Sequence, residues 1–230
     1  MIKKLIYILV LVGAGIIMAQ LFAGFSGSTE LSETARYYAE TGLEETGAAN
    51  LVTAVIVTYR GLDTLGEVTI LFTVAAIIAF FMKTREQRDK PKRRVSEILT
   101  TGARILVPGT MLFGAYIFIN GHLSPGGGFQ GGAIIASGFA LMLLAFPQAN
   151  LSHKTIRWVE SISGFSFVII GVLGIFMAGG FLDNSILPLG NFGSLFSAGA
   201  IPIIYIFIGL KVGAELSNVV GHMHEKQKEI

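Results

Sequence analysis

The sequence predicts an all-α integral membrane protein with six transmembrane helices and both termini in the cytoplasm. Only 14% of the 230 residues are charged and 52% are hydrophobic, and the hydrophobic residues gather in long runs. Soluble domains carry roughly 25% charged residues, so these proportions exclude an ordinary water-soluble globule. The predicted location is the cell membrane, with the lipid bilayer around the chain.

Six stretches are candidates for membrane spans, because a spanning helix needs about 20 predominantly apolar residues. They are residues 5–25, 68–82, 98–119, 131–146, 156–178 and 198–220. The second and fourth stretches are short unless the turns that flank them are also helical. The first begins like a secretory signal, but its apolar run exceeds the roughly 7 to 15 residues of a signal peptide. We therefore interpret it as a membrane anchor.

Basic residues predict which way the spans run. Lys and Arg cluster around positions 3–4, 83–94, 154–157 and 226–228, whereas the alternate segments 26–67, 120–130 and 179–197 contain only Arg36 and Arg60. Because basic residues accumulate on the cytoplasmic side of membrane proteins, the alternate segments are expected outside. This pattern predicts that both termini are cytoplasmic.

A hydrophilic run at residues 83–94 divides the chain. It is strongly basic, and Pro91 within it discourages a continuous helix. We interpret it as a cytoplasmic linker between a two-span segment, residues 1–82, and a four-span domain, residues 95–230.

The composition excludes several function classes. The chain has no Cys, so it cannot hold an iron–sulfur cluster or a Cys-ligated zinc ion, and a redox centre would have to lie in a partner. We therefore expect no cofactor in this chain. Its net charge of +2 gives no sign of nucleic-acid binding.

The first candidate site lies before the second span. Apolar residues at positions 51, 52, 55, 56 and 59 predict an amphipathic helix that lies at an interface or packs against other helices. The glycines between Arg60 and Glu67 predict a broken helix. Asp63 and Glu67 could then share a face beside Arg60, which suits passage of a proton or transient binding of Na⁺. Alternatively, Thr64 and Glu67 form a capping box, a purely structural role.

The second candidate site is the Gly-rich segment Gly121-His-Leu-Ser-Pro-Gly-Gly-Gly-Phe-Gln-Gly-Gly132. Its glycines permit a tight irregular turn whose amides face a cavity, and His122 is its only group that titrates near neutral pH. His122 is either part of a proton or ion relay or an ordinary loop histidine. The residues expected to shape the turn are Gly126, Gly127, Gly128 and Gln130.

Ionisable residues at membrane depth form a third group of candidates, because each costs on the order of 2.5 to 3.5 kcal/mol unless it is paired, solvated or functional. Arg104 lies in the third span, near its predicted cytoplasmic end. Lys211 and Glu215 are four residues apart on the sixth span, so their side chains can meet on one face of the helix. This pair is predicted either to be structural or to belong to an ion path.

Small residues on two spans predict close helix packing, because they let helix backbones approach one another. They are Gly132, Ala136 and Ala140 on the fourth span and Gly164, Gly171, Gly174 and Ala178 on the fifth.

These motifs resemble a known family. Residues 100–110, the Gly121–Gly132 segment and residues 209–213 resemble the B subunit of Mrp-type multisubunit Na⁺/H⁺ antiporters. Residues 50–67 look like the membrane tail of the antiporter A subunit. The same modules occur in archaeal ferredoxin-driven respiratory complexes, the membrane-bound hydrogenases and the sulfane sulfur reductases, and the fused arrangement favours one of these.

The resemblance implies a membrane subunit of a Na⁺ or H⁺ translocation module, with a sulfane sulfur reductase as the first choice of parent complex. The alternatives are a membrane-bound hydrogenase, a stand-alone Mrp antiporter and a purely structural spacer without an ion path. Implied partners are other Mrp-like membrane subunits and peripheral redox subunits that carry iron–sulfur clusters, so the chain is not an enzyme by itself. By the same likeness, Asp63, Glu67, His122 and Lys211 fall on ion-pathway positions, whereas the role of Glu215 rests on its spacing from Lys211.

Overall fold

The computed structural model describes residues 2–24, 30–82, 95–149 and 151–227, and the regular structure within these ranges is entirely helical. The chain divides into two units, residues 1–37 and residues 38–230. The predicted basic linker at 83–94 lies outside the described residues.

The first unit contains helix α1, Ile2–Gly24, and the beginning of α2, Glu33–Thr46. From Leu5 to Ala19 α1 carries only apolar and small side chains and Tyr7, and none of its membrane-spanning segment is buried within the chain. Such a helix needs lipid or another chain around it. α2 starts after Ser32, whose hydroxyl accepts a hydrogen bond from the Ala35 amide at 3.3 Å, a typical N-cap.

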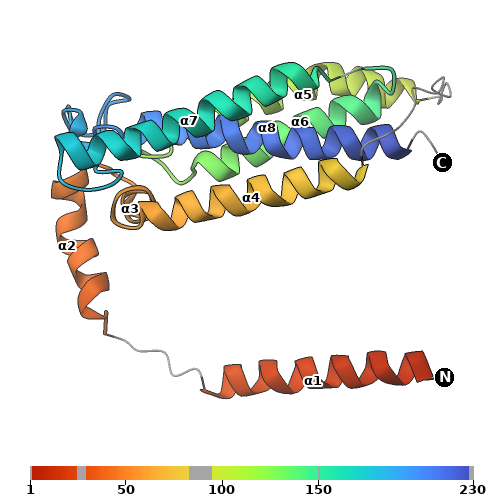
Figure 1. Cartoon of the computed structure of the whole chain (residues 1–230), viewed down its shortest axis with the longest axis horizontal. Helices are drawn as coiled ribbons and strands as arrows, with labels where there is room; N and C mark the ends of the chain where they lie inside the picture. The colour runs from red at the N-terminus through yellow and green to blue at the C-terminus, as the bar shows by residue number, and fades with distance from the viewer. Residues whose placement is uncertain (1, 25–29, 83–94, 150, 228–230) are drawn as a thin grey trace. The chain divides into compact units, whose positions relative to one another are not determined.

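The second unit is a bundle of long helices (Figure 1). After α2 the described elements are α3, Leu51–Ala54; η1, a π-helical turn at Val55–Tyr59; α4, Gly61–Met82; α5, Glu97–Ile119; α6, Gly128–Ala145; α7, His153–Met177; η2, Asn184–Ile186; and α8, Ile201–Gln227. Serine caps begin two of them: Ser96 accepts from the Leu99 amide and Ser152 from the Thr155 amide, each at 3.3 Å.

The six predicted spans are confirmed within α1, α4, α5, α6, α7 and α8, whose candidate membrane-spanning segments have 18 to 25 residues each. α4 and α6 are longer than their apolar runs because they begin at Gly61 and Gly128, so the flanking glycine-containing turns are helical. The placement of both termini in the cytoplasm stays a prediction.

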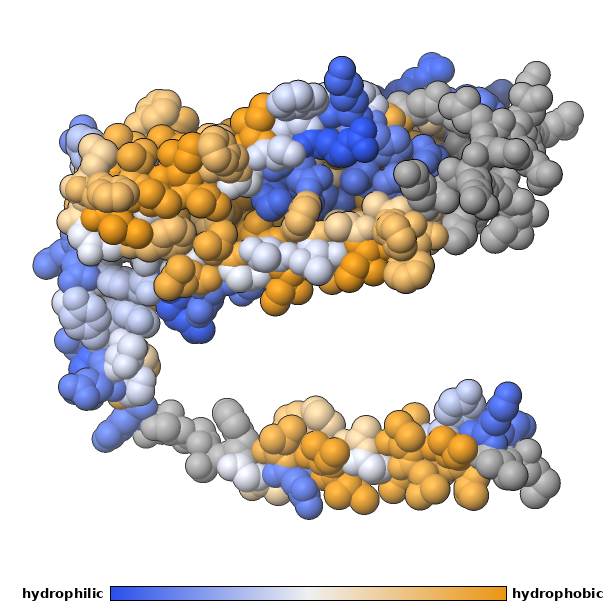
Figure 2. All heavy atoms as spheres, in the orientation of Figure 1, coloured by the Kyte–Doolittle hydropathy of each residue, from blue (hydrophilic) through white to orange (hydrophobic). Residues whose placement is uncertain are grey.

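Helix α8 forms the core of the second unit. Half of the residues in its apolar membrane-spanning stretch are buried, more than for any other span. The helix packs against α4, α5, α6 and α7. Ile201, Ile204 and Ile208 of α8 are fully buried against Phe167 of α7. Figure 2 shows the complementary surface: hydrophobic side chains cover much of the visible face of α4 and of the C-terminal half of α7, as expected for contact with lipid.

Close packing at the small residues is confirmed, but on α7 two of these glycines pack against a loop rather than against a helix. Gly132 of α6 lies against the backbone of α8, where a Cβ would come within 2.7 Å of the Gly209 carbonyl oxygen. Gly171 and Gly174 of α7 instead lie against the loop at residues 180–183, which folds back over the helix end. Small residues therefore accommodate a loop as well as a neighbouring helix.

The structure refines the prediction for residues 50–67. The apolar stripe is divided: positions 55, 56 and 59 are half-buried, whereas Leu51 and Val52 are exposed, and the fully buried residues of this segment include Thr53, Ala54 and Val57. The helix break is confined to Arg60, at the start of the predicted stretch, because α3 and η1 run without a gap to Tyr59 and α4 is continuous from Gly61.

Candidate functional site

A buried ion pair lies within α8. The Lys211 ammonium Nζ donates to Glu215 Oε1 at 2.6 Å, and the two residues are 9% and 0% exposed. The second carboxylate oxygen of Glu215, Oε2, has no hydrogen-bond partner among the described residues. The predicted contact between the two side chains is thus confirmed, and it leaves one buried acceptor oxygen open to a proton or cation.

Two other helices surround the Lys211 ammonium. Phe72 of α4 presents its ring face, with Nζ 5.0 Å from the ring centroid, a cation–π distance. Gly164 of α7 makes room for the lysine, since a Cβ there would lie 3.2 Å from Lys211 Cδ. Glu160, one turn earlier on α7, is half-buried and close enough for the Lys211 charge to act on it, but no ion pair among the described residues joins the two side chains. Glu215 is therefore the ion-pair partner of Lys211, and Glu160 is a second carboxylate in its neighbourhood.

Glu160 was missed by the sequence reasoning, although an acidic residue within the fifth span is itself a signal. Lys211 is 51 residues away from it in sequence, so no local spacing rule links the two.

The acidic residues of α4 lie apart from this pair. Arg60 Nε donates to Asp63 Oδ2 at 2.7 Å, and both side chains are more than half exposed. Glu67 is also exposed. No ion pair among the described residues joins Asp63 or Glu67 to Lys211. The Asp63 and Glu67 carboxylates therefore lie on the outer surface of the chain.

The predicted capping box is wrong. Thr64 is the fourth residue of α4 rather than the residue that caps it, it is 2% exposed, and its hydroxyl donates to the Ile56 carbonyl at 2.8 Å. Thr64 therefore joins α4 to η1 and leaves the Glu67 carboxylate without a capping role.

The Gly-rich loop between α5 and α6 is fastened by the α3 segment. The Asn50 side-chain Nδ2 donates to the carbonyls of Gly121 and Ser124 at 2.9 and 3.0 Å. The backbone N–H of Asn50 donates to the His122 carbonyl at 3.0 Å. The Thr53 hydroxyl donates to Gly121 at 2.6 Å and accepts from the Tyr205 hydroxyl at 3.1 Å. The loops predicted to share one side of the membrane thus meet at one end of the bundle.

His122 is fully buried in this loop. Its Nε2 lies 3.4 Å from the Ser194 carbonyl oxygen, and its Nδ1 has no hydrogen-bond partner among the described residues. Burial lowers the pKa of the imidazole below its ordinary value of 6.5, and the backbone hydrogen bond to Ser194 opposes part of that effect. His122 is therefore a neutral histidine at neutral pH.

The remaining predicted residues occupy mixed positions. Gly127 and Gly128 are buried against Tyr205 and Ile208 of α8, which leaves no room for a side chain. Gly126 is half-buried, whereas Gln130 and Arg104 are exposed. The glycines thus shape the loop, and Arg104 on α5 takes no part in the buried charge pair.

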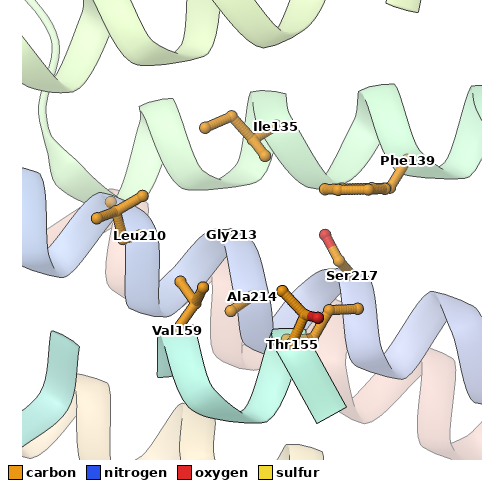
Figure 3. Close-up of a pocket in the computed structure, with 10 residues that line it drawn as sticks. Ile135, Phe139, Thr155, Val159, Leu210, Gly213, Ala214 and Ser217 are labelled. Carbon is orange, nitrogen blue, oxygen red and sulfur yellow. The ribbon is translucent and has the colours of Figure 1, made fainter. Parts of the chain in front are cut away.

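An apolar cavity of about 220 Å³ lies between α6, α7 and α8 (Figure 3). Its walls include Ile135, Phe139, Val159, Leu210 and Ser217. Apart from the hydroxyls of Thr155 and Ser217, the side chains that line the cavity are apolar, and the Ser217 hydroxyl has no partner among the described residues, so the cavity suits a hydrocarbon group rather than an ion.

Two family descriptions match the chain. Residues 98–218 match a domain related to the MnhB subunit of the Na⁺/H⁺ antiporter, and residues 2–96 match MbhE, the family of the E subunit of MBH.

Individual relatives agree with these matches. A chain of the archaeal membrane-bound sulfane sulfur reductase, a respiratory membrane complex, is 44% identical with a TM-score of 0.84, covering 97% of this chain and 98% of that one. A chain of the Mrp complex from Dietzia sp. DQ12-45-1b is 26% identical with a TM-score of 0.77, covering 96% of this chain and 26% of that one. The uncharacterized protein MJ1307 of Methanocaldococcus jannaschii is 30% identical, over 73% of this chain and 74% of the relative.

Proposed function

Because the chain belongs to the family related to the MnhB subunit of Na⁺/H⁺ antiporters, we propose that it is a membrane subunit of the ion-translocation module of a respiratory complex of the sulfane sulfur reductase type. Its neighbours in that complex are other Mrp-like membrane subunits and redox subunits. The catalysis and the iron–sulfur clusters belong to those redox subunits, and this chain is an accessory, multi-pass component.

The observation that carries the proposal is the charge cluster around Lys211. An ionisable residue inside a membrane span is costly and is kept where it pairs or lines an ion path. Lys211 pairs with Glu215 on its own helix, Glu160 of α7 lies in the neighbourhood without an ion pair to it, and Glu215 Oε2 has no partner among the described residues. We propose that a proton or Na⁺ reaches Glu215 when the Lys211 ammonium turns toward Glu160, and leaves when it returns.

The exposed acidic residues of α4 support a second ion-binding position on this path. Asp63 and Glu67 are four residues apart and face outward, so a neighbouring subunit or water completes the oxygen ligands that Na⁺ requires. We propose that Na⁺ binds there transiently, with Arg60 competing for Asp63. His122, buried and neutral, is proposed to serve this path from the loop end of the bundle.

A structural spacer is the second candidate function, and the tight loop contacts of Gly171 and Gly174 favour it. A spacer needs packing but no mobile charge, so it should tolerate the loss of both members of the Lys211–Glu215 pair.

The double variant Lys211→Met with Glu215→Leu tests the proposal in the assembled complex. Both substitutions keep side-chain volume and remove charge together, so assembly should persist. We expect Na⁺-dependent transport in vesicles to fall at least about tenfold, a rise of ~1.4 kcal/mol in the barrier. Unchanged transport in an assembled double variant would establish the spacer instead.

A further inference from the structure

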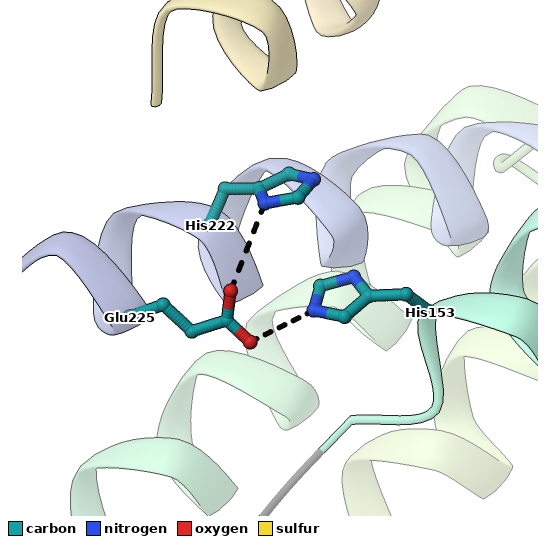
Figure 4. Close-up of side chains that lie close together, drawn as sticks. All are labelled: His153, His222 and Glu225. Atoms are coloured by element: carbon teal, nitrogen blue, oxygen red, sulfur yellow. Dashed lines mark hydrogen bonds and ion pairs between the residues drawn. The ribbon is translucent and has the colours of Figure 1, made fainter. Parts of the chain in front are cut away.

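Three metal-ligand side chains meet where α7 begins and α8 ends (Figure 4). His153 is the first residue of α7, and His222 and Glu225 lie on the last turns of α8. The two imidazole rings stack with centroids 4.7 Å apart and planes inclined by 15°. The Glu225 carboxylate lies beside both rings, with Oε1 2.9 Å from His153 Nε2 and Oε2 3.9 Å from His222 Nδ1.

The donor set is the one that zinc-class ions prefer. Two imidazole nitrogens and a carboxylate oxygen are common zinc ligands. His222 and Glu225 are three residues apart, so one face of α8 presents both toward His153. The ligand atoms all lie within 4.8 Å of one another, and this is the one such group that the described part of the chain contains. The side chains are 20% to 43% exposed, so an ion can reach them.

A neighbouring amide orients the first ligand. His153 Nδ1 lies 2.9 Å from Asn218 Oδ1, and because an amide oxygen only accepts, Nδ1 carries the hydrogen. The lone pair of the neutral ring is then on Nε2, the atom that faces Glu225. Metal-binding histidines characteristically donate their other nitrogen to an oxygen in this way.

The contact between His153 and Glu225 requires a positive charge. A neutral Nε2 and a carboxylate oxygen both present lone pairs, so they repel at 2.9 Å unless a proton or a metal ion lies between or beside them. A metal ion would bind to both atoms and to His222, whereas a proton would satisfy His153 and Glu225 alone.

We propose that His153, His222 and Glu225 bind a divalent transition-metal ion of the zinc class. The ion takes these three ligands at about 2.0 to 2.2 Å, which needs a small closure of the side chains, and a water molecule at the fourth position. It ties the start of α7 to the end of α8. This site is distinct from the ion path proposed above, because no hydrogen bond or ion pair among the described residues joins its side chains to Lys211 or Glu215.

Zinc binding by the full chain in detergent tests the site. The chain carries four histidines, so it should be purified with a tag that contains none, stripped with a chelator and titrated with Zn²⁺ by calorimetry. We expect one zinc ion per chain and a rise in Tm on binding. Co²⁺ in place of zinc should give the visible absorption of a tetrahedral site.

Matched variants locate the ion. His222→Gln and Glu225→Gln should each weaken zinc binding at least about tenfold. His224→Gln, on the same helix but outside the group, should leave it unchanged. The proposal is overturned if the unaltered chain binds no zinc, if His224→Gln weakens binding as much as His222→Gln, or if only acidification raises Tm, which would identify the cluster as a protonated ion pair.

Discussion

Lys211 and Glu215 form an ion pair one helical turn apart on α8, with Nζ 2.6 Å from Oε1 and no exposed surface on the glutamate. The pair lies in the most buried span of the chain, beside Phe72 of α4 and Gly164 of α7. A charged group in such a position depends on its partner, because neither side chain can reach bulk water.

Removing one partner should therefore cost more than removing both. Lys211→Met leaves Glu215 buried and unpaired, so we expect a loss of about 3 to 5 kcal/mol in the free energy of unfolding. Lys211→Met with Glu215→Leu should recover most of that loss. Thermal unfolding of the two variants compares them, and a double variant less stable than the single would contradict the pairing.

Glu67→Gln tests the ion-binding position proposed at Asp63 and Glu67 on α4. The substitution preserves shape and removes a negative charge, and Glu67 has no capping role that would be lost. We expect normal assembly with Na⁺-dependent transport reduced about tenfold, measured in vesicles. Glu97→Gln, in the exposed first turn of α5, is the control and should leave transport intact. Full transport by Glu67→Gln would place the path elsewhere.

Asn50→Ala should loosen the Gly-rich loop. The variant loses two donated hydrogen bonds to Gly121 and Ser124 and one accepted from Val52, each worth about 1 kcal/mol. The expected loss of about 2 to 3 kcal/mol lowers Tm by about 4 to 12 °C. Asn120→Ala removes one local hydrogen bond and should have less than half this effect. Equal effects would show that the α3 segment does not hold the loop.

Two Gly→Ala substitutions should have opposite signs. At Gly174 a Cβ would meet backbone atoms, including the Asp183 and Leu182 amide nitrogens at 2.9 and 3.1 Å, so we expect a loss of about 1 to 3 kcal/mol. At Gly66 of α4 nothing lies within 4 Å, and alanine should stabilise the helix by about 0.5 to 1 kcal/mol. Thermal unfolding of the chain in detergent measures both, and stabilisation at Gly174 would exclude the close loop contact.

The stability of the chain should depend on pH through His122. Because burial lowers the pKa of His122 below 6.5, the unfolded chain binds the proton more readily than the folded chain. Stability contributed by the neutral ring is present above pH 6.5 and is lost as the pH falls toward the lower folded pKa. His122→Gln should flatten the fall in Tm between about pH 7.5 and 5.5. An unchanged pH profile would mean that other groups control it.

The sequence predicts the membrane spans more fully than it predicts the contacts of the candidate site. Span number and approximate bounds follow from composition, because a bilayer demands a minimum apolar length whatever the helices contact. The Lys211–Glu215 contact also follows, because four-residue spacing on a helix is local geometry. The failures concern residues 50–67, where the buried face and the role of Thr64 depend on hydrogen bonds to Gly121 and Ile56 rather than on hydrophobic periodicity.

The sequence by itself thus determined a six-span helical membrane protein, its family resemblance and the contact between Lys211 and Glu215, which lie one turn apart on a single helix. Only the tertiary structure decided that Gly164 and Phe72 lie beside Lys211, that Asn50 holds the Gly-rich loop, and that His153 meets His222 and Glu225. The physical reason is distance along the chain: each of these contacts joins residues from different elements, and side-chain chemistry at such separations becomes visible only after the helices have packed.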